Sequence, residues 1–189
     1  MSDRVFLCNL ERNVGKGEAI RQGFAFARRT GLLDHAEWFG YWDADMSTPL
    51  TELDHFFDYA RLYDLDRVDG IFGSRVLRLG SRIERSPVRH YLGRVFTTLV
   101  DSMFELGCYD TQCGSKLFRT AIADEAFAEP FVSRWIFDIE ILLRLRGRRI
   151  VEYPLRAWRD VGGGTLSVRR ELIPTLKDIV RIRRRYRAR

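Results

Sequence analysis

The alternation of short apolar runs with segments of helical periodicity constrains the fold of this chain more than any other feature. Trp38 to Trp42 and Gly70 to Ser74 are apolar runs with the length of a buried strand. Before and between them, Glu18 to Arg29 and Leu53 to Ala60 place apolar residues three or four positions apart, as amphipathic helices do. A further run rich in Val, Phe and Leu, Val5 to Leu10, predicts a strand at the start. This order predicts an α/β fold whose central strands are largely parallel.

The second half of the chain continues the mixture of strands and helices. Ser86-Pro87 predicts a helix start, because serine is a favoured N-cap and proline suits the first helical position, and this helix runs to about Phe104. Lys116 to Phe118 and Ile150 to Pro154 predict strands. Further helices are predicted at 121–127, 137–145 and from 172 to the end. A chain of 189 residues with 46% hydrophobic residues fits one globular domain, residues 1–170, followed by a basic amphipathic helix, residues 171–189.

Two carboxylates separated by one residue, Asp43 and Asp45, directly follow the apolar run that ends at Trp42. Mg²⁺ and Mn²⁺ take oxygen ligands, and Mg²⁺ commonly uses one or two carboxylates together with substrate phosphates. In a chain with 32 Lys and Arg residues, the pair suggests a divalent-cation site that bridges a phosphate. A solvated acidic turn at the end of a strand explains the same spacing, and so short a motif is weak by itself.

The positive charge of the chain is concentrated at its end. Arg181 to Arg189 holds six arginines and no acid, and the rest of the chain is neutral. Such a tail can contact anionic lipid head groups, although a solvated helix end with cations on its dipole explains it equally well. A nucleic-acid partner is not expected, because the neutral body lacks a broad basic face. Three cysteines without paired spacing indicate reduced thiols, so we expect a cytoplasmic protein, peripheral on the cytosolic membrane face if the tail binds lipid.

Two segments carry groups suited to anions. The loop Asn13 to Gly17 precedes a predicted helix, so its backbone N–H groups could cradle a phosphate, although the spacing of a P-loop is absent. The stretch Arg75 to Arg94 holds six arginines and one acid, Glu84, and arginine suits bidentate phosphate contacts. A solvated loop and helix start explains this stretch equally well. Arg89 falls in the first turn of its predicted helix, where a bound anion would offset the unfavourable dipole.

Two further segments are polar at the start of predicted elements. Asp110 to Lys116 leads into a strand, and Asp138 and Glu140 begin a helix. The first segment can be explained as an ordinary connecting loop. The second can be explained by the general preference for acids at a helix N-terminus. A catalytic role for the two acids requires that the fold bring them to the Asp43–Asp45 turn, which spacing alone does not show.

Taken in order, these segments resemble one family, the family 2 glycosyltransferases of GT-A fold, and within it the enzymes that glycosylate polyprenyl and dolichyl phosphates. The resemblance covers roughly residues 13–158 and implies a Rossmann-like, mixed but mainly parallel sheet flanked by helices. Its motifs are Asn-x-Gly-Lys-Gly-x-Ala-Ile-Arg-x-Gly (13–23), Asp-Ala-Asp-x-Ser-Thr-Pro (43–49), Gly-Ser-Arg (73–75), Arg-Ser-x-x-Arg (85–89), Asp-Thr-Gln-Cys-Gly-x-Lys-Leu-Phe (110–118), Arg-Trp-x-Phe-Asp-x-Glu (134–140) and Glu-x-Pro-x-x-x-Trp (152–158).

The resemblance implies a role for each matching position. Asp43 and Asp45 would hold Mg²⁺ or Mn²⁺ against the diphosphate of a sugar nucleotide, with Asp45 the stronger candidate for direct ligation. Lys16 would lie on the nucleotide side of the site, so these three residues form the donor-binding group. The positions implied to bind the phosphate of the acceptor are Arg75, Arg89, Gln112 and Lys116.

The resemblance also implies the reaction, transfer of a hexose from a UDP-glucose or GDP-mannose type of donor to a polyprenyl or dolichyl phosphate. Asp138 and Glu140 match a segment near the sugar and are the implied catalytic residues. The displacement would be in line and inverting, with the metal neutralising charge on the departing diphosphate. A lipid phosphate is already an anionic nucleophile, so a strong base is not required, whereas a hydroxyl acceptor would make Asp138 the candidate base.

The family normally begins with a strand, an acidic turn and a further strand that hold the nucleobase and ribose. This chain starts about where that unit would end, so we expect the unit to be missing and a sheet edge to be exposed. The chain is therefore expected to be either a fragment of an enzyme or a degenerate relative. In the second case it would be a non-catalytic module of GT-A type that binds phosphates or a protein.

Overall fold

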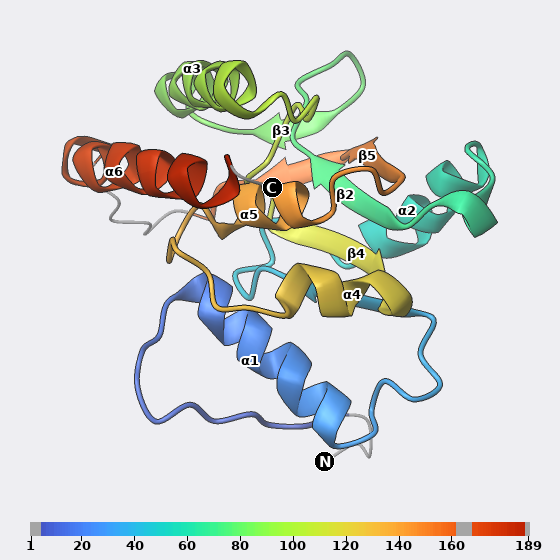
Figure 1. Ribbon diagram of the computed structural model, residues 1–189. Helices are drawn as coiled ribbons and strands as arrows, with labels where there is room; N and C mark the ends of the chain where they lie inside the picture. The colour runs from blue at the N-terminus through green and yellow to red at the C-terminus, as the bar shows by residue number, and fades with distance from the viewer. Residues whose placement is uncertain (1–4, 162–167, 188–189) are drawn as a thin grey trace.

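The computed structural model describes residues 5–161 and 168–187, without the side chains of Arg89 and of residues 168–172. Helices flank a central sheet on both faces (Figure 1). In chain order the elements are α1 (Lys16–Arg29), β1 (Trp38–Trp42), α2 (Glu52–Arg61), a 3-10 turn (Leu65–Arg67), β2 (Gly70–Ser74), β3 (Arg82–Glu84), α3 (Pro87–Phe104), β4 (Ser115–Arg119), α4 (Thr120–Phe127), α5 (Phe137–Arg144), β5 (Ile150–Pro154), β6 (Ala157–Arg159) and α6 (Val168–Tyr186).

The central sheet has the strand order β1-β4-β2-β5. β4 is antiparallel to both of its neighbours, and β2 and β5 are parallel. β1, β2 and β5 therefore run in one direction and β4 runs against them, which confirms the expected mixed, mainly parallel α/β fold. The expectation of parallel central strands is wrong for β4, because the chain enters this strand from the opposite end of the sheet.

Alternating side chains divide the sheet between two cores. Phe72 and Phe118 face the layer formed by α1, α4 and α5. Ile71 and Leu117, their neighbours in sequence, face α2 on the other side. All five residues of β2 are buried, which is typical of a strand covered on both faces. These packed layers hold the ends of β1, β2 and β4 in fixed positions, and the polar residues of the chain gather there.

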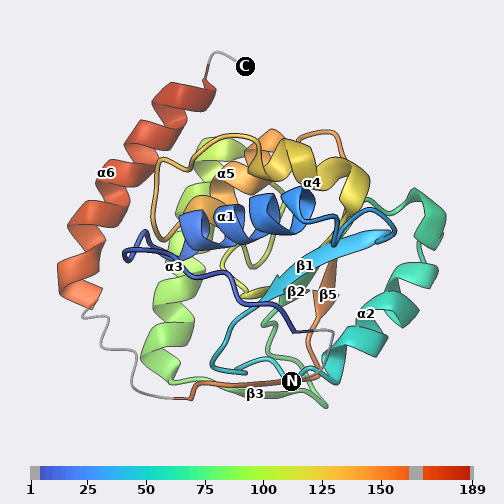
Figure 2. The same ribbon diagram turned by 90° about the horizontal axis from the view of Figure 1, so that it is seen from below.

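A third apolar cluster joins α3 and α6 to α5. Val100 of α3, Ile139 of α5 and Ile182 of α6 are completely buried in it. α3 and α6 lie side by side along one edge of the molecule (Figures 1 and 2). Among the described helices, none is both long and apolar enough to cross a lipid bilayer.

The first predicted strand is absent from the structure. Residues 5–10 have no regular secondary structure, and Val5, Phe6 and Leu7 are 56% to 74% exposed. Within residues 5–161 and 168–187, β1 pairs with β4 alone, so its other edge is open as expected. The strand prediction was wrong because apolar composition does not supply the hydrogen-bonded neighbour that a strand needs.

The arginine-rich stretch contains a strand that its composition does not indicate. Arg82–Glu84 forms β3, which pairs in parallel with Ala157–Arg159 of β6. This small second sheet anchors the chain just before α3, which begins at Pro87 as predicted. The stretch is therefore partly structural, and its arginines fall on more than one element.

Candidate active site

Asp43 and Lys16 meet at the end of β1. Asp43 follows the last residue of the strand, and its backbone N–H donates to the carbonyl of Gly114, 2.8 Å away. Lys16 is the first residue of α1, and its Nζ lies 2.6 Å from Asp43 Oδ1, with both side chains about one third exposed (31% and 32%). A lysine at a helix N-terminus opposes the helix dipole, which Asp43 offsets. The fold thus brings a cation and a carboxylate of the predicted donor group together at an open position.

Asp45 is exposed and shapes the turn that follows. Its Oδ1 accepts a hydrogen bond of 2.9 Å from the backbone N–H of Ser47, an Asx-turn contact. Met46 between them has a φ of 55°, so the chain reverses sharply here. The described residues hold no group of three His, Cys, Asp or Glu side chains suited to a metal. Two carboxylates that leave further positions to phosphate or water nevertheless fit the usual coordination of Mg²⁺, and carboxylate oxygens also suit Mn²⁺.

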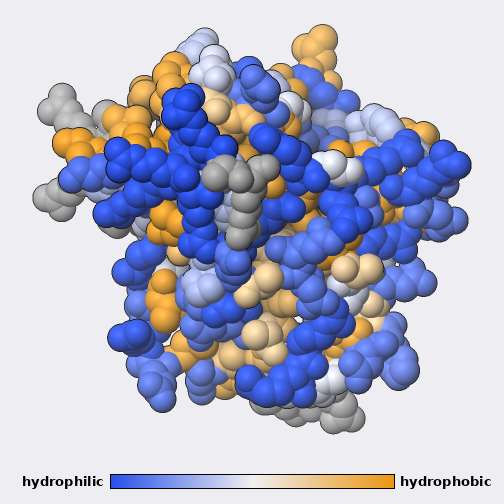
Figure 3. Space-filling model, in the orientation of Figure 1, coloured by the Kyte–Doolittle hydropathy of each residue, from blue (hydrophilic) through white to orange (hydrophobic). Residues whose placement is uncertain are grey.

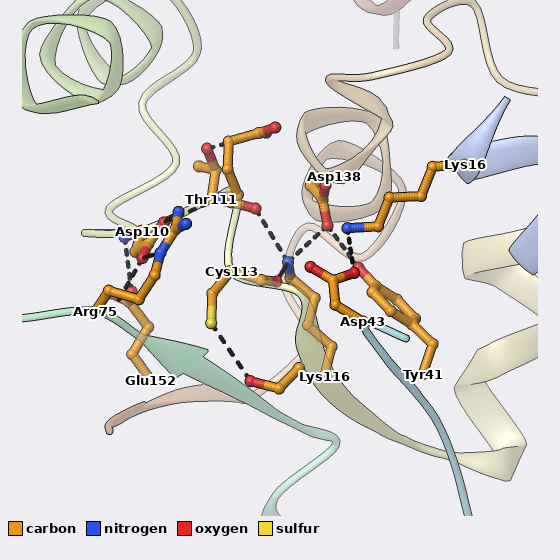
Figure 4. A network of polar contacts seen from close by, with 12 residues as sticks. Lys16, Tyr41, Asp43, Arg75, Asp110, Thr111, Cys113, Lys116, Asp138 and Glu152 are labelled. Carbon is orange, nitrogen blue, oxygen red and sulfur yellow. Dashed lines mark hydrogen bonds and ion pairs between the residues drawn. The ribbon is translucent and has the colours of Figure 1, made fainter. Parts of the chain in front are cut away.

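A buried network lies beside this pair (Figure 4). Asp138, in the first turn of α5, is only 3% exposed. Its Oδ1 accepts hydrogen bonds from Lys116 Nζ at 2.6 Å and from the Tyr41 hydroxyl at 2.5 Å. β1, β4 and α5 each contribute one member, so the network exists only in the folded chain. It holds the Asp138 carboxylate in one orientation close to Asp43.

Lys116 has no hydrogen-bond donor left for a ligand. Its ammonium donates to the carbonyls of Thr111 and Cys113 as well as to Asp138, and the residue is fully buried. Burial acts to lower the pKa of Lys116, but the surrounding groups, Asp138 foremost, together outweigh it and the pKa is raised. Burial, together with Asp138, raises the pKa of Tyr41 as well. Direct binding of an acceptor phosphate by Lys116 stays a prediction. In this structure its ammonium donates a hydrogen bond to Asp138.

Glu140 lies apart from this network. It is fully buried, and its Oε1 accepts hydrogen bonds from the backbone N–H groups of Val132 and Ser133 at 2.8 and 3.1 Å. Arg144 and Tyr186 approach its other oxygen at 3.8 and 3.4 Å. Burial raises the pKa of Glu140, although its backbone hydrogen bonds and Arg144 act in the opposite direction. These contacts stabilise the loop before α5, and the predicted catalytic role of Glu140 remains untested.

Arg75 and Asp110 form a second buried pair, at the end of β2. Arg75 Nε and Nη2 donate to the two carboxylate oxygens of Asp110 at 2.6 and 2.8 Å. Glu152 of β5 accepts the backbone N–H groups of Tyr109 and Asp110. Burial acts to raise the pKa of Asp110, but Arg75 outweighs it and the pKa falls to about 2. Arg75 is thus held in one orientation, with its bidentate face occupied by a carboxylate.

The lowered pKa of Asp110 predicts a specific acid sensitivity. Because the folded-state pKa lies below the unfolded value, the stabilisation is present above about pH 4 and is lost as the pH falls towards 2, amounting to about 2 kcal/mol. In Asp110→Asn we expect a lower free energy of unfolding at neutral pH and a decline between about pH 5 and pH 2 that is smaller by this amount. Urea unfolding across that range measures it. Equal declines in both proteins would contradict the assignment.

A small pocket opens beside Arg75. Its polar lining includes Arg94, whose guanidinium lies 3.9 Å from the ring centroid of Tyr109. Arg94 Nη1 is buried and has no hydrogen-bond partner within the described chain. Gln112 also lines the pocket, whereas the side chain of Arg89 lies outside the described residues, and acceptor binding by both stays a prediction. The other charged or titratable residues of the lining are Arg85, His90 and Asp110.

Three residues at the site have structural roles that the sequence patterns do not reveal. The sequence places Tyr41 in an apolar run and Arg94 among six arginines. The resemblance places Gly114 in the loop on the acceptor side, without a physical reason for a glycine there. A Cβ atom on Gly114 would lie 1.8 Å from Asp43 Oδ2, so only glycine lets the loop approach the carboxylate. A glycine inside a polar loop that leads into a strand was the available signal.

Several curated proteins are similar in sequence to this chain. Dolichyl-phosphate β-glucosyltransferase of Saccharomyces cerevisiae is 32% identical over 95% of the chain, and that of Homo sapiens is 32% identical over 98%. The enzyme of Dictyostelium discoideum is 31% identical over 98%. The chain spans 55% to 56% of the length of these relatives. No family model matches the chain.

Solved structures show the same fold at lower identity. Glucosyl-3-phosphoglycerate synthase of Mycobacterium tuberculosis, a GT-A glycosyltransferase, superposes with a TM-score of 0.56 at 18% identity. The match covers 90% of this chain and 56% of that one. That protein was crystallised with Mn²⁺, UDP-glucose and phosphoglyceric acid. The resemblance inferred from the ordered motifs is therefore confirmed, and the fold is of GT-A type.

Proposed function

Because this chain is a relative of the dolichyl-phosphate β-glucosyltransferases and has the GT-A fold, we propose that it is a metal-dependent, inverting glycosyltransferase. Its donor would be a nucleotide sugar of the UDP-glucose or GDP-mannose type, and its acceptor a polyprenyl or dolichyl phosphate. One observation carries the proposal. Asp43, Lys16 and Asp138 converge at the end of β1, although they lie far apart in the sequence.

The donor diphosphate would lie at Asp43, Asp45 and the N-terminus of α1. Lys16 and the backbone N–H groups of the first helical turn favour an anion there. Asp43 and Asp45 would hold Mg²⁺ or Mn²⁺, and that ion would neutralise the charge that develops on the departing nucleoside diphosphate. The Mn²⁺ and UDP-glucose in the solved structure of similar fold are consistent with this arrangement.

The acceptor phosphate would lie in the pocket beside Arg75. Arg94 supports this placement, because a buried guanidinium N–H without an acceptor is costly and an anion in the pocket would satisfy it. Gln112 offers an amide at the same wall. Because Asp110 already occupies the bidentate face of Arg75, this arginine would add mainly positive charge and position.

Asp138 would face the reacting sugar. Its Oδ1 accepts hydrogen bonds from Lys116 and Tyr41, which fix the direction of the carboxylate. A carboxylate at this position would stabilise positive charge at the anomeric carbon as the bond to the donor breaks. With a phosphate nucleophile no proton needs to be removed, so Asp138 would act by its charge.

The arginine-rich end of α6 suggests where the reaction takes place. Arg183, Arg184 and Arg187 are exposed, and we expect them to meet the anionic head groups of a membrane on its cytosolic face. The free thiols of Cys8, Cys108 and Cys113 are consistent with that compartment. Arg189 lies outside the described residues.

Calorimetry with UDP-glucose and with GDP-mannose, each with and without Mn²⁺, tests the proposal. We expect one donor to bind more tightly with the metal, because the ion joins the carboxylates to the diphosphate. Asp45→Asn should reduce this metal enhancement by at least about tenfold, or roughly 1.4 kcal/mol. Asp58→Asn, which alters an exposed acid on α2 that pairs with Arg61, is the matched control and should bind like the wild type.

Two outcomes would contradict the proposal. If neither nucleotide sugar binds in the presence of Mn²⁺, the chain has no donor site, and inorganic phosphate binding would then favour the non-catalytic phosphate-binding module. If the metal enhancement survives in Asp45→Asn, Asp45 is not the ligand.

A further inference from the structure

Lys16 and Asp43 form an ion pair at the point where the proposed function requires each of them to meet a ligand. Lys16 Nζ lies 2.6 Å from Asp43 Oδ1, and the ammonium points at this carboxylate (Figure 4). In the proposed donor site the carboxylate binds a divalent cation and the ammonium binds a phosphate. Two cations that share one carboxylate oxygen repel each other strongly at such distances. The pair must therefore open before both groups can meet their ligands.

Asp43 is held in place by the loop before β4. Its backbone N–H donates to the carbonyl of Gly114 at 2.8 Å. Its carboxylate packs so closely on the same residue that a Cβ atom on Gly114 would lie 1.8 Å from Oδ2 and 2.5 Å from Oδ1. Because the carboxylate has no room to withdraw towards this loop, the opening of the pair falls to Lys16.

The backbone of Lys16 is fixed, whereas its side chain reaches the solvent. Arg134 Nη2 donates to the carbonyl and the side-chain oxygen of Asn13 at 3.2 and 3.0 Å, which holds the loop before α1. Gly17 is buried against α5, where a Cβ atom would lie 2.6 Å from Cγ of Phe137. The Lys16 side chain is 31% exposed, and a lysine carries its ammonium on a flexible four-carbon stem. The ammonium can therefore change partners by side-chain rotation, without movement of α1.

A second lysine–aspartate pair shows what such an exchange requires. The side chains of Lys116 and Asp138 are 0% and 4% exposed, and their separation would leave a buried charge without a partner. The side chains of Lys16 and Asp43 are 31% and 32% exposed, and ion pairs with such access to water are weak. The Lys116–Asp138 pair is therefore permanent in the folded chain, whereas the Lys16–Asp43 pair is exchangeable.

An anion at the start of α1 would be a second partner for Lys16. Lys16 is the first residue of this helix, where the unsatisfied backbone N–H groups favour an anion. A diphosphate carries more negative charge than one carboxylate, and it would meet these N–H groups and the ammonium together. The Lys16 side chain thus has two acceptors within its range, the Asp43 carboxylate and an anion bound at the helix start.

We propose that Lys16 is an exchangeable counter-ion of the donor site: its ammonium neutralises Asp43 until the metal binds there, and then moves to the diphosphate of the donor. The inference rests on the proposed function and adds a coupling between its two ligands. Charge is balanced before and after, because Asp43 exchanges one cation for another and Lys16 exchanges one anion for another. Metal and diphosphate therefore bind cooperatively, since each releases a group that the other needs.

Lysine acylation, with the product at each position measured by mass spectrometry, tests the exchange. The chain has three lysines, of which Lys116 is fully buried and Lys177 is exposed. We expect Mn²⁺ alone to raise the acylation rate of Lys16 at least about twofold, because an amine held by a carboxylate is shielded from the reagent. UDP or GDP added with Mn²⁺ should lower the rate again, because the diphosphate then holds the ammonium. Lys177 should react alike under all conditions.

Two variants separate the steps of the exchange. In Asp43→Asn, Lys16 should be acylated without metal as fast as in the wild type with Mn²⁺, and Mn²⁺ should no longer change the rate. In Lys16→Gln, titration of free Mn²⁺ by electron paramagnetic resonance should show about fivefold tighter binding of the metal alone than in the wild type, whereas UDP in saturating Mn²⁺ should bind at least about fivefold more weakly.

Arg12→Gln is the matched control for Lys16→Gln. It removes the same charge from the same part of the chain, and Arg12 is exposed. It should change the affinities for Mn²⁺ and for UDP by less than about twofold, because water and salt screen a charge that touches neither ligand. Equal melting temperatures of the variants would show that the fold is kept.

The exchange is overturned if Mn²⁺ binds to the wild type without changing the acylation of Lys16, or if Lys16→Gln and Arg12→Gln alter the Mn²⁺ affinity equally. Metal-dependent binding of a nucleotide sugar would then still support the proposed function. A wild type that shows the exchange with Mn²⁺ and inorganic pyrophosphate, but binds neither UDP-glucose nor GDP-mannose, would support the exchange and contradict the proposed function. Mn²⁺ that binds neither to the wild type nor to Lys16→Gln would contradict both.

Discussion

Replacing Lys116 by methionine is expected to lower the free energy of unfolding by about 3–5 kcal/mol. The side chain is fully buried, and its ammonium is the hydrogen-bond donor to Asp138 and to the carbonyls of Thr111 and Cys113. Methionine fills a similar volume but donates nothing, so a buried carboxylate is left without its counterion. Removing one partner of a buried ion pair costs far more than the pair contributes as a whole.

Urea unfolding at neutral pH measures the loss, with Lys177→Met as the matched control. Lys177 is exposed on α6, so its replacement should change the free energy by less than about 0.5 kcal/mol. The double variant Lys116→Met/Asp138→Asn should be more stable than Lys116→Met, because the uncompensated charge is removed with its partner. A loss below about 1 kcal/mol in Lys116→Met would contradict a buried ion pair at this position.

The raised pKa of Lys116 gives the same pair an alkaline signature. For a lysine whose pKa is higher in the folded state, the stabilisation is complete below the unfolded value and is lost as the pH rises through the folded one. The wild type should therefore lose this contribution only at strongly alkaline pH. Lys116→Met should lack that part of the decline.

Replacing Gly114 by alanine is expected to disable the donor site and to destabilise the fold by about 1–3 kcal/mol. The new methyl carbon would lie 1.8 Å from Asp43 Oδ2, which no contact between heavy atoms allows. Either Asp43 leaves Lys16, or the loop leaves the end of β1 and breaks the hydrogen bond from the Asp43 N–H to the Gly114 carbonyl. Either movement should weaken metal-dependent binding of a nucleotide sugar by at least about tenfold.

Gly23→Ala provides a control of opposite sign. Gly23 lies within α1, and a Cβ atom there would have no neighbour within 4 Å. Alanine in a helix interior is more favourable than glycine by about 0.5–1 kcal/mol, so this variant should gain stability and keep donor binding. Urea unfolding and calorimetry with Mn²⁺ compare the two variants. Unchanged binding by Gly114→Ala would show that Asp43 takes no part in the site.

Local sequence patterns predicted most helices and strands correctly. The pattern of apolar residues in a segment reflects which of its own side chains are buried. Trp38–Trp42, Gly70–Ser74 and Ile150–Pro154 are strands with the predicted bounds, and the helix at Pro87 begins and ends as predicted. The same reasoning predicted a strand at Val5 to Leu10 wrongly, because in the described structure this segment has no strand beside it to pair with. The short strands β3 and β6 were missed, since each has only three residues, and the packing of Ile83 and Trp158 against the core is too short a pattern to predict a strand.

At the candidate site, too, the sequence indicated which kinds of side chain are present but not which of them pair. The motifs identified carboxylates at Asp43 and Asp138 and cations at Lys16, Arg75 and Lys116, and all five lie at the ends of β1, β2 and β4 or at facing helix starts (Figure 4). The sequence did not reveal that Lys116 pairs with Asp138, or that Arg75 pairs with Asp110. In each case a residue predicted to meet a substrate phosphate meets a carboxylate of the chain itself.

The sequence by itself determined the class of fold, the family resemblance and the kinds of charge at the site, because these follow from the order of short motifs and from burial periodicity. Only the tertiary structure decided the antiparallel course of β4, the partners of each buried charge and the close approach of Gly114 to Asp43. These depend on which strands and loops become neighbours across long separations in the chain. Which strands and loops become neighbours depends on how whole layers pack together, and the sequence of a single segment does not encode this packing.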